Sequence, residues 1–105
     1  KKVRRLALRG ALSSLVREKR LIVIEDFKVE NLKTKEFEKQ LRKFGEFDDV
    51  LLVLPEYDEN LFKIARNIEY IELITPKYLN AYKCLAYNNV IFTKAALKKL
   101  QEAIK

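Results

Sequence analysis

Two acidic residues and a Thr-Lys pair are the side chains of this sequence best suited to metal or phosphoryl chemistry. Glu25 and Asp26 follow one apolar run, and Thr93 and Lys94 follow another. If both runs are parallel strands, their carboxyl ends meet at the edge where open α/β sheets bind ligands. Mg²⁺ is commonly held there by carboxylates and a substrate phosphate. One hypothesis is therefore a small-molecule or phosphoryl-binding α/β domain that uses the Glu25/Asp26 edge.

Other catalytic chemistry is scarce. The chain has no His, and Cys84 is its single Cys, so this thiol has neither a disulfide partner in the chain nor an imidazole to activate it. We interpret it as an inert, half-buried thiol in a reducing compartment. Ser13 and Ser14 have no general base near them in sequence. Gly10 and Gly45 are too few for a phosphate-binding loop or a dinucleotide fingerprint. We predict no catalytic residues, no metal and no cofactor, so the protein is not expected to be an enzyme.

Cations are concentrated at the start of the chain. The net charge is +7, and residues 1–20 contain eight Lys or Arg and one acid, whereas residues 21–105 are neutral overall. On a helix of about 100° per residue, Lys2, Arg5 and Arg9 share one stripe. A solvated charged face is the simplest interpretation, but the Arg fork matches phosphate well and favours a polyanion. A membrane is not expected, because the longest uncharged run has ten residues against roughly 20 for a spanning helix.

The elements that must position these residues follow from apolar spacing. We predict a helix over residues 3–17, whose broad arc includes Ala7, Gly10 and Ala11 for close packing. Residues 21–24 and 50–54 are continuous apolar runs, typical of strands covered on both faces. Residues 70–74 alternate like an edge strand, and residues 90–92 form a fourth strand.

Three further helices are expected between and after these strands. One is capped by Thr34 and ends near Gly45, one is capped by Asp58, and a last one follows Thr93. A short helical turn is predicted over residues 80–85, and Asp48-Asp49 is predicted to be an exposed turn. Alternating strands and helices predict the α/β class, with a four-stranded, mostly parallel sheet, helices on both faces, and one domain over residues 1–105.

The first block of the sequence carries a family resemblance. Residues 2–13, KVRRLALRGALS, resemble the segment KVRRLALRSALS of the bacterial-type large-subunit ribosomal protein four family. The resemblance continues over residues 33–37, 65–67, 79–80 and 87–88 and covers essentially the whole chain. Gly10 and Tyr78 are departures, because Ser and Gly are usual there.

The resemblance implies an α/β domain bound to large-subunit rRNA, with neighbouring ribosomal proteins as further partners and no enzymatic activity. It implies a cytoplasmic ribosome, and organellar ribosomes use the same family. An N-terminal strand and a long loop are implied upstream of Lys1, and the chain does not begin with Met, so we expect a fragment of a longer protein.

Charge and resemblance together predict the residues that contact rRNA. The cations of the first helix come from the charge pattern, and the others lie in the later blocks of resemblance. A protein-binding module, with little salt dependence, remains a third hypothesis. The predicted rRNA contacts are Lys1, Lys2, Arg4, Arg5, Arg9, Lys35, Arg66, Asn67 and Asn80.

Overall fold

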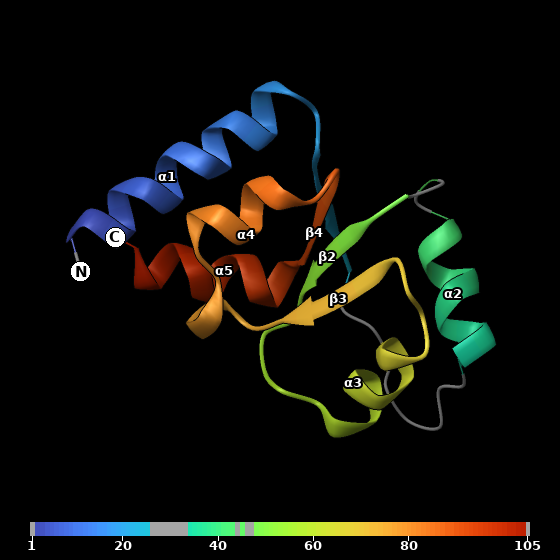
Figure 1. The fold of residues 1–105 in the computed structure, drawn as a ribbon. Coiled ribbons are helices and arrows are strands. Elements are labelled where there is room, and N and C mark those ends of the chain that lie inside the picture. The colour runs from blue at the N-terminus through green and yellow to red at the C-terminus, as the bar shows by residue number, and fades with distance from the viewer. Residues whose placement is uncertain (1, 26–33, 44, 46–47, 105) are drawn as a thin grey trace.

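A computed structural model describes residues 2–25, 34–43, 45 and 48–104 of the chain, with the side chains of residues 2–4 and 34 outside the description. Strands and helices alternate along these residues, as Figure 1 shows. The elements are α1 (Lys2–Arg17), β1 (Leu21–Ile24), α2 (Thr34–Arg42), β2 (Val50–Val53), α3 (Glu59–Arg66), β3 (Ile71–Ile74), η1 (Pro76–Tyr78), α4 (Ala81–Ala86), β4 (Asn89–Thr93) and α5 (Lys94–Ala103).

The four strands form one parallel sheet in the order β1-β4-β2-β3. The last strand in sequence, β4, lies inside the sheet, where Val90 pairs with Leu21 of β1 on one side and with Leu51 of β2 on the other. This arrangement confirms the predicted four-stranded parallel sheet of an α/β domain. It also places β1 and β3 at the two edges.

Helices cover both faces of the sheet, as predicted. In β2, Val50 and Leu52 face α2 and α3, whereas Leu51 and Val53 face α1, α4 and α5, and all four are fully buried. Such a strand needs an apolar side chain at every position, which explains its continuous apolar run. The sheet therefore separates two apolar clusters, one on each face.

The two edge strands differ in how well the sequence predicted them. β3 is an edge strand, as its alternation predicted. β1 was expected to be covered on both faces, but it is the other edge: Leu21 and Ile22 are half-buried and Val23 is 44% exposed. The helices pack over the central strands, so a terminal strand is covered only in part even when its sequence is wholly apolar.

The orientation of α1 also differs from the prediction. Leu8, Ala11 and Leu15 are buried, and the helix packs chiefly on α4. Leu6 is 66% exposed, and a Cβ added at Gly10 would meet nothing within 4 Å. The expected close approach at Ala7 and Gly10 is therefore absent. The apolar residues of α1 form two overlapping stripes, and α4 covers only one of them.

Two of the predicted helix caps, Asp58 and Thr93, are confirmed. Asp58 accepts a hydrogen bond from the Leu61 amide at 3.0 Å, and Thr93 accepts one from the Ala96 amide at 3.2 Å. Gly45 has a φ of 142°, in the region that favours glycine, beyond the end of α2. Thr34 begins α2, but its side chain lies outside the description. Tyr78, which replaces a usual Gly, lies in η1 without a positive φ, so this turn does not require Gly.

The apolar cluster beneath α1, α4 and α5 gives a test of the fold. Leu51→Ala removes a fully buried side chain and is expected to lower the free energy of unfolding by about 2 to 5 kcal/mol. Val23→Ala, on the exposed edge of β1, is the matched control and should cost less than about 1 kcal/mol. Urea unfolding of both variants measures the difference, and equal losses would contradict this assignment of core and edge.

Candidate nucleic-acid interface

Two of the predicted rRNA contacts lie together on α1. Arg5 and Arg9 are exposed, one helical turn apart, on a helix whose buried residues Leu8, Ala11 and Leu15 face α4. Lys2 belongs to the same helix, as does Arg4, but these two side chains are outside the described part of the structure, and so is all of Lys1. Arg5 and Arg9 therefore lie on the exposed side of α1.

Arg9 also has a structural contact that the sequence did not indicate. Its guanidinium donates a hydrogen bond to the backbone carbonyl of Ile104, which caps the C-terminus of α5. A cation is favourable at that position because the carbonyl end of a helix carries partial negative charge. Arg9 therefore joins the first helix to the last while its side chain stays exposed.

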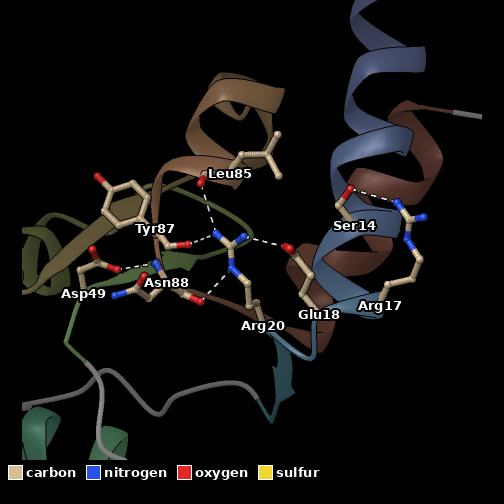
Figure 2. A network of polar contacts seen from close by, with 8 residues as sticks. All are labelled: Ser14, Arg17, Glu18, Arg20, Asp49, Leu85, Tyr87 and Asn88. Carbon is tan, nitrogen blue, oxygen red and sulfur yellow. Dashed lines mark hydrogen bonds and ion pairs between the residues drawn. The ribbon is translucent and has the colours of Figure 1, made fainter.

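Arg20 is the most connected cation of the basic segment (Figure 2). Its Nε donates to the carbonyl of Asn88 at 3.0 Å, and one terminal nitrogen donates to Glu18 Oε1 at 2.8 Å. The other terminal nitrogen donates to the carbonyls of Leu85, at 3.2 Å, and Tyr87. The planar guanidinium of Arg, with five N–H donors, suits several such hydrogen bonds at once. Arg20 therefore links the α1–β1 turn to the end of α4 and the segment before β4, and we call this contact the Arg20 junction.

The backbone around Arg20 reinforces this junction. Lys19 has a φ of 60°, and the Arg20 amide donates to the Leu15 carbonyl at 2.8 Å, which ends α1. The Val90 amide donates to the Arg20 carbonyl at 3.0 Å. On the far side, the Asp49 carboxylate accepts a hydrogen bond from the Asn88 amide, so Asp49 is part of the junction rather than the simple exposed turn predicted.

The cations of residues 1–20 thus divide into two groups. Arg20 is occupied by Glu18 and backbone carbonyls, and Arg17 donates to the hydroxyl of Ser14 at 3.2 Å. Both lie at the C-terminal end of the segment. Arg5 and Arg9 lie in the N-terminal half of α1, where both are exposed and Arg9 also donates to the Ile104 carbonyl.

The other predicted contacts are not brought together with α1. Lys35 and Arg66 are exposed in α2 and α3, which cover the opposite face of the sheet, and Asn67 follows α3. Asn67 is the C-cap of α3. Asn80 is exposed at the start of α4, where its side chain caps the helix by accepting a hydrogen bond from the Lys83 amide at 2.8 Å. The Asn80 side chain therefore has a structural role, whereas Asn67 ends α3 through its backbone amide.

The phosphoryl alternative gains no support from this geometry. Parallel pairing of β1 with β4 does bring Glu25 beside Lys94, and their side chains form an ion pair at 2.6 Å. Asp26 lies outside the described residues. Within the described part of the chain, no three His, Cys, Asp or Glu side chains are grouped closely enough to hold a metal ion.

Cys84 is more deeply buried than predicted. Its side chain is fully enclosed in the cluster under α1 and α4, not half-buried. Burial disfavours the thiolate and raises the pKa of the Cys84 thiol to about 11. These features agree with the interpretation of Cys84 as an inert packing residue.

Four parallel strands between two helical layers, with an excess of cations on the first helix, define a small basic α/β domain. No helix in the described residues combines the length and apolarity needed to cross a membrane. The chain belongs to the ribosomal protein L4/L1 family, whose family model matches residues 1–103. This match confirms the resemblance noted in the sequence.

Individual relatives agree with the family match. Large ribosomal subunit protein uL4 of Thermoanaerobacter sp. (strain X514) is 42% identical over 102 residues, which are 97% of this chain and 49% of that protein. The protein of the same name from Clostridium botulinum (strain Okra / Type B1) is 38% identical with the same coverage. That of Hahella chejuensis is 38% identical over 104 residues. The chain spans about half the length of these relatives.

The Arg20 junction predicts a large effect on stability. Arg20→Ala removes a charged donor from backbone carbonyls and is expected to lower the free energy of unfolding by about 2 kcal/mol. Arg20→Lys keeps the charge without the fork and should recover only part of this loss. Arg17→Ala, which removes a single exposed hydrogen bond, is the control and should change stability by less than about 0.5 kcal/mol. Equal denaturant midpoints for the Arg20 and Arg17 variants would contradict a stabilising role of the Arg20 hydrogen bonds.

Burial of the Cys84 thiol predicts that the free energy of unfolding falls at alkaline pH. The unfolded chain releases the thiol proton above pH 9.0, whereas the folded protein keeps it to about pH 11. The folded state then binds more protons, so stability falls as the pH rises through this window. Cys84→Ala removes this contribution. At neutral pH the variant should have a lower free energy of unfolding than the parent. Between neutral pH and pH 11 this difference, measured by urea unfolding, should shrink by about 2 kcal/mol. A deficit that is constant with pH would contradict the burial of the thiol.

Proposed function

We propose that this chain is a structural, non-catalytic constituent of the large ribosomal subunit that binds rRNA through the basic side of α1. The family and the names of its relatives support the ribosomal role. Neighbouring ribosomal proteins are the further partners in this proposal. The cellular site is the ribosome of the cytoplasm or of an organelle that uses the same family.

One observation carries the proposed mode of binding: α1 contains five Lys or Arg residues and no acid, and its Arg5 and Arg9 are exposed. Glu18 is the one acid in residues 1–20, and it is already paired with Arg20. Residues 1–20 therefore carry a positive charge excess that the one acid of this segment does not balance. Phosphates of a nucleic acid would remove the repulsion among these cations and release bound counterions.

The expected recognition is of RNA shape and phosphates, not of base edges. The major groove of A-form RNA is too deep and narrow for a helix to read, so cations on α1 would contact the backbone on either side of a groove. α1 itself contains no aromatic residue that could stack on an unpaired base. Its proposed role is to place the domain on the rRNA.

The remaining candidates belong to a second contact in this proposal. Lys35, Arg66 and Asn67 lie beyond the sheet from α1, so a single flat RNA surface would not reach both groups. A folded rRNA could contact the two faces with different segments. Asn80 would contribute through its exposed side, in addition to capping α4.

The proposed rRNA contact predicts strong salt dependence. Four to six phosphate contacts from Lys2, Arg4, Arg5, Arg9 and their neighbours correspond to a slope of roughly 3 to 5 for the fall of log affinity with log salt concentration. Arg5→Ala should reduce this slope by about one. Filter binding or fluorescence anisotropy with bacterial large-subunit rRNA fragments, at several salt concentrations, measures both quantities.

Lys98→Ala is the matched control, because Lys98 is an exposed cation on α5 outside the basic side of α1. Its slope should equal that of the parent. An Arg5→Ala, Arg9→Ala double variant that keeps the affinity and the slope of the parent would show that the cations of α1 are only a solvated face. Arg9→Ala is also expected to lower stability, through its lost contact with Ile104, so folding of the double variant is checked by circular dichroism.

A further inference from the structure

An open pocket lies along the free edge of β3, away from α1. Its volume is about 400 Å³, and β3 contributes its floor through Glu72, Leu73 and Ile74, followed by Thr75. In Figure 1, β3 is the terminal strand of the sheet, with α3 on one side and α4 on the other. The pocket walls come from these two sides: Tyr57 and Phe62 from one, and Tyr78 and Lys83 from the other.

Aromatic rings dominate the walls of this pocket. The rings of Tyr57 and Phe62 are in contact, with centroids 4.5 Å apart. Tyr57 is 62% exposed and Tyr78 is 67% exposed, although neither caps an element or fills the core. Flat, exposed rings on both walls of one pocket are suited to a planar ligand that stacks on them.

The polar groups of the pocket are held in place. Lys83 Nζ lies 2.6 Å from Glu72 Oε2, and the Tyr87 hydroxyl is hydrogen-bonded to Glu72. Tyr87 does not line the pocket, but burial and its hydrogen bond to the Glu72 carboxylate raise the pKa of Tyr87 to about 12, so its hydroxyl stays protonated and helps to position Glu72. Thr75 adds a half-buried hydroxyl. A ligand ring stacked on the tyrosines would thus have positioned hydrogen-bond donors and acceptors at its edge. Specific ligand pockets usually combine apolar walls with a few such polar groups.

Cations lie at both ends of this edge. Lys77 Nζ is 5.6 Å from the centre of the Tyr78 ring, just beyond the carboxyl end of β3. At the other end, a smaller hollow of about 150 Å³ continues the pocket past Phe62 to Arg66 and Ile71. Arg66 is itself one of the predicted rRNA contacts. The groove therefore runs between positive charges, which suits a phosphodiester backbone.

We infer that the Tyr57/Tyr78 pocket binds an unpaired nucleobase of RNA, stacked on the tyrosine rings, with the adjoining backbone running from Arg66 towards Lys77. This inference rests on the proposed rRNA binding and adds a base-specific contact that α1 does not offer. Single-stranded bases are the usual targets of aromatic stacking in RNA recognition.

An added peptide strand is a poorer occupant of the same edge. β3 is only four residues long and is followed directly by Pro76. Glu72 adds a charged side chain to the strand, where Lys83 already pairs with it. Short length, a charge and a flanking Pro are the features by which sheet edges avoid strand addition.

The test uses the 105-residue chain and bacterial large-subunit rRNA fragments at several salt concentrations, and affinities are compared at equal salt. A Tyr57→Ala, Tyr78→Ala double variant is expected to lose about 10- to 100-fold in affinity, the size of a lost stacking contact. Its salt slope should equal that of the parent, because no phosphate contact is removed. Tyr82→Ala is the matched control: Tyr82 is 80% exposed on the neighbouring α4 but does not line the pocket. It should bind within about twofold of the parent.

Two further measurements separate the outcomes. Tyr78→Phe keeps the ring and should retain nearly the parent affinity, which distinguishes stacking from a loss of folding. Ultraviolet cross-linking of the parent complex, followed by mass spectrometry, should place a nucleotide on Tyr57 or Tyr78. If the double variant binds like the parent while Arg5→Ala still lowers the salt slope, the pocket is not an RNA site and the proposed function stands. If the parent shows no salt-dependent rRNA binding, both proposals fail.

Discussion

The position of β4 between β1 and β2 is the constraint on which the rest of the structure depends. Among the described residues, β1 joins the sheet through β4, which in turn pairs with β2. The basic helix α1 precedes β1 directly, so its placement depends on the same pairing. Arg20 strengthens this link by bonding the backbone that leads into β4 (Figure 2). A guanidinium at this junction satisfies several carbonyls at once, where a single neutral donor would leave most of them to solvent.

The cations of the first segment therefore serve two physical purposes. Arg20 and Arg17 are engaged within the protein, and Arg9 both bonds α5 and remains exposed. The net charge of the sequence does not distinguish these two kinds of cation. A cation that is hydrogen-bonded to a carbonyl and a cation that is exposed to solvent contribute equally to it. The separation matters for binding, since a long-range positive field includes every cation whereas close phosphate contacts require an accessible one.

The fold was more predictable than the site. The continuous apolar run of β2 and the alternation in β3 indicated a covered strand and an edge strand, and Asp58 and Thr93 indicated helix starts; each reflects a local rule. The error at β1 arose because burial of an edge depends on the strand order, which no local pattern encodes. The role of Arg20 was missed because the backbone carbonyls that it bonds lie more than sixty positions away in the sequence. The rings around β3 likewise come from separate segments, and none of them belongs to a recognisable motif.

The insertion of the last strand into the middle of the sheet also has a consequence for how the protein forms. During synthesis, α1 and β1 emerge before the other described elements, and among the described strands β1 pairs with β4, the last to be made. β2 and β3 can pair with each other earlier, because they are adjacent both in sequence and in the sheet. The contacts of β1 span most of the chain, and such contacts form late because the intervening loop must first be closed. The apolar side of α1 stays uncovered for the same interval, so a nascent chain bears its basic helix as an undocked amphipathic segment until translation of this region is nearly finished.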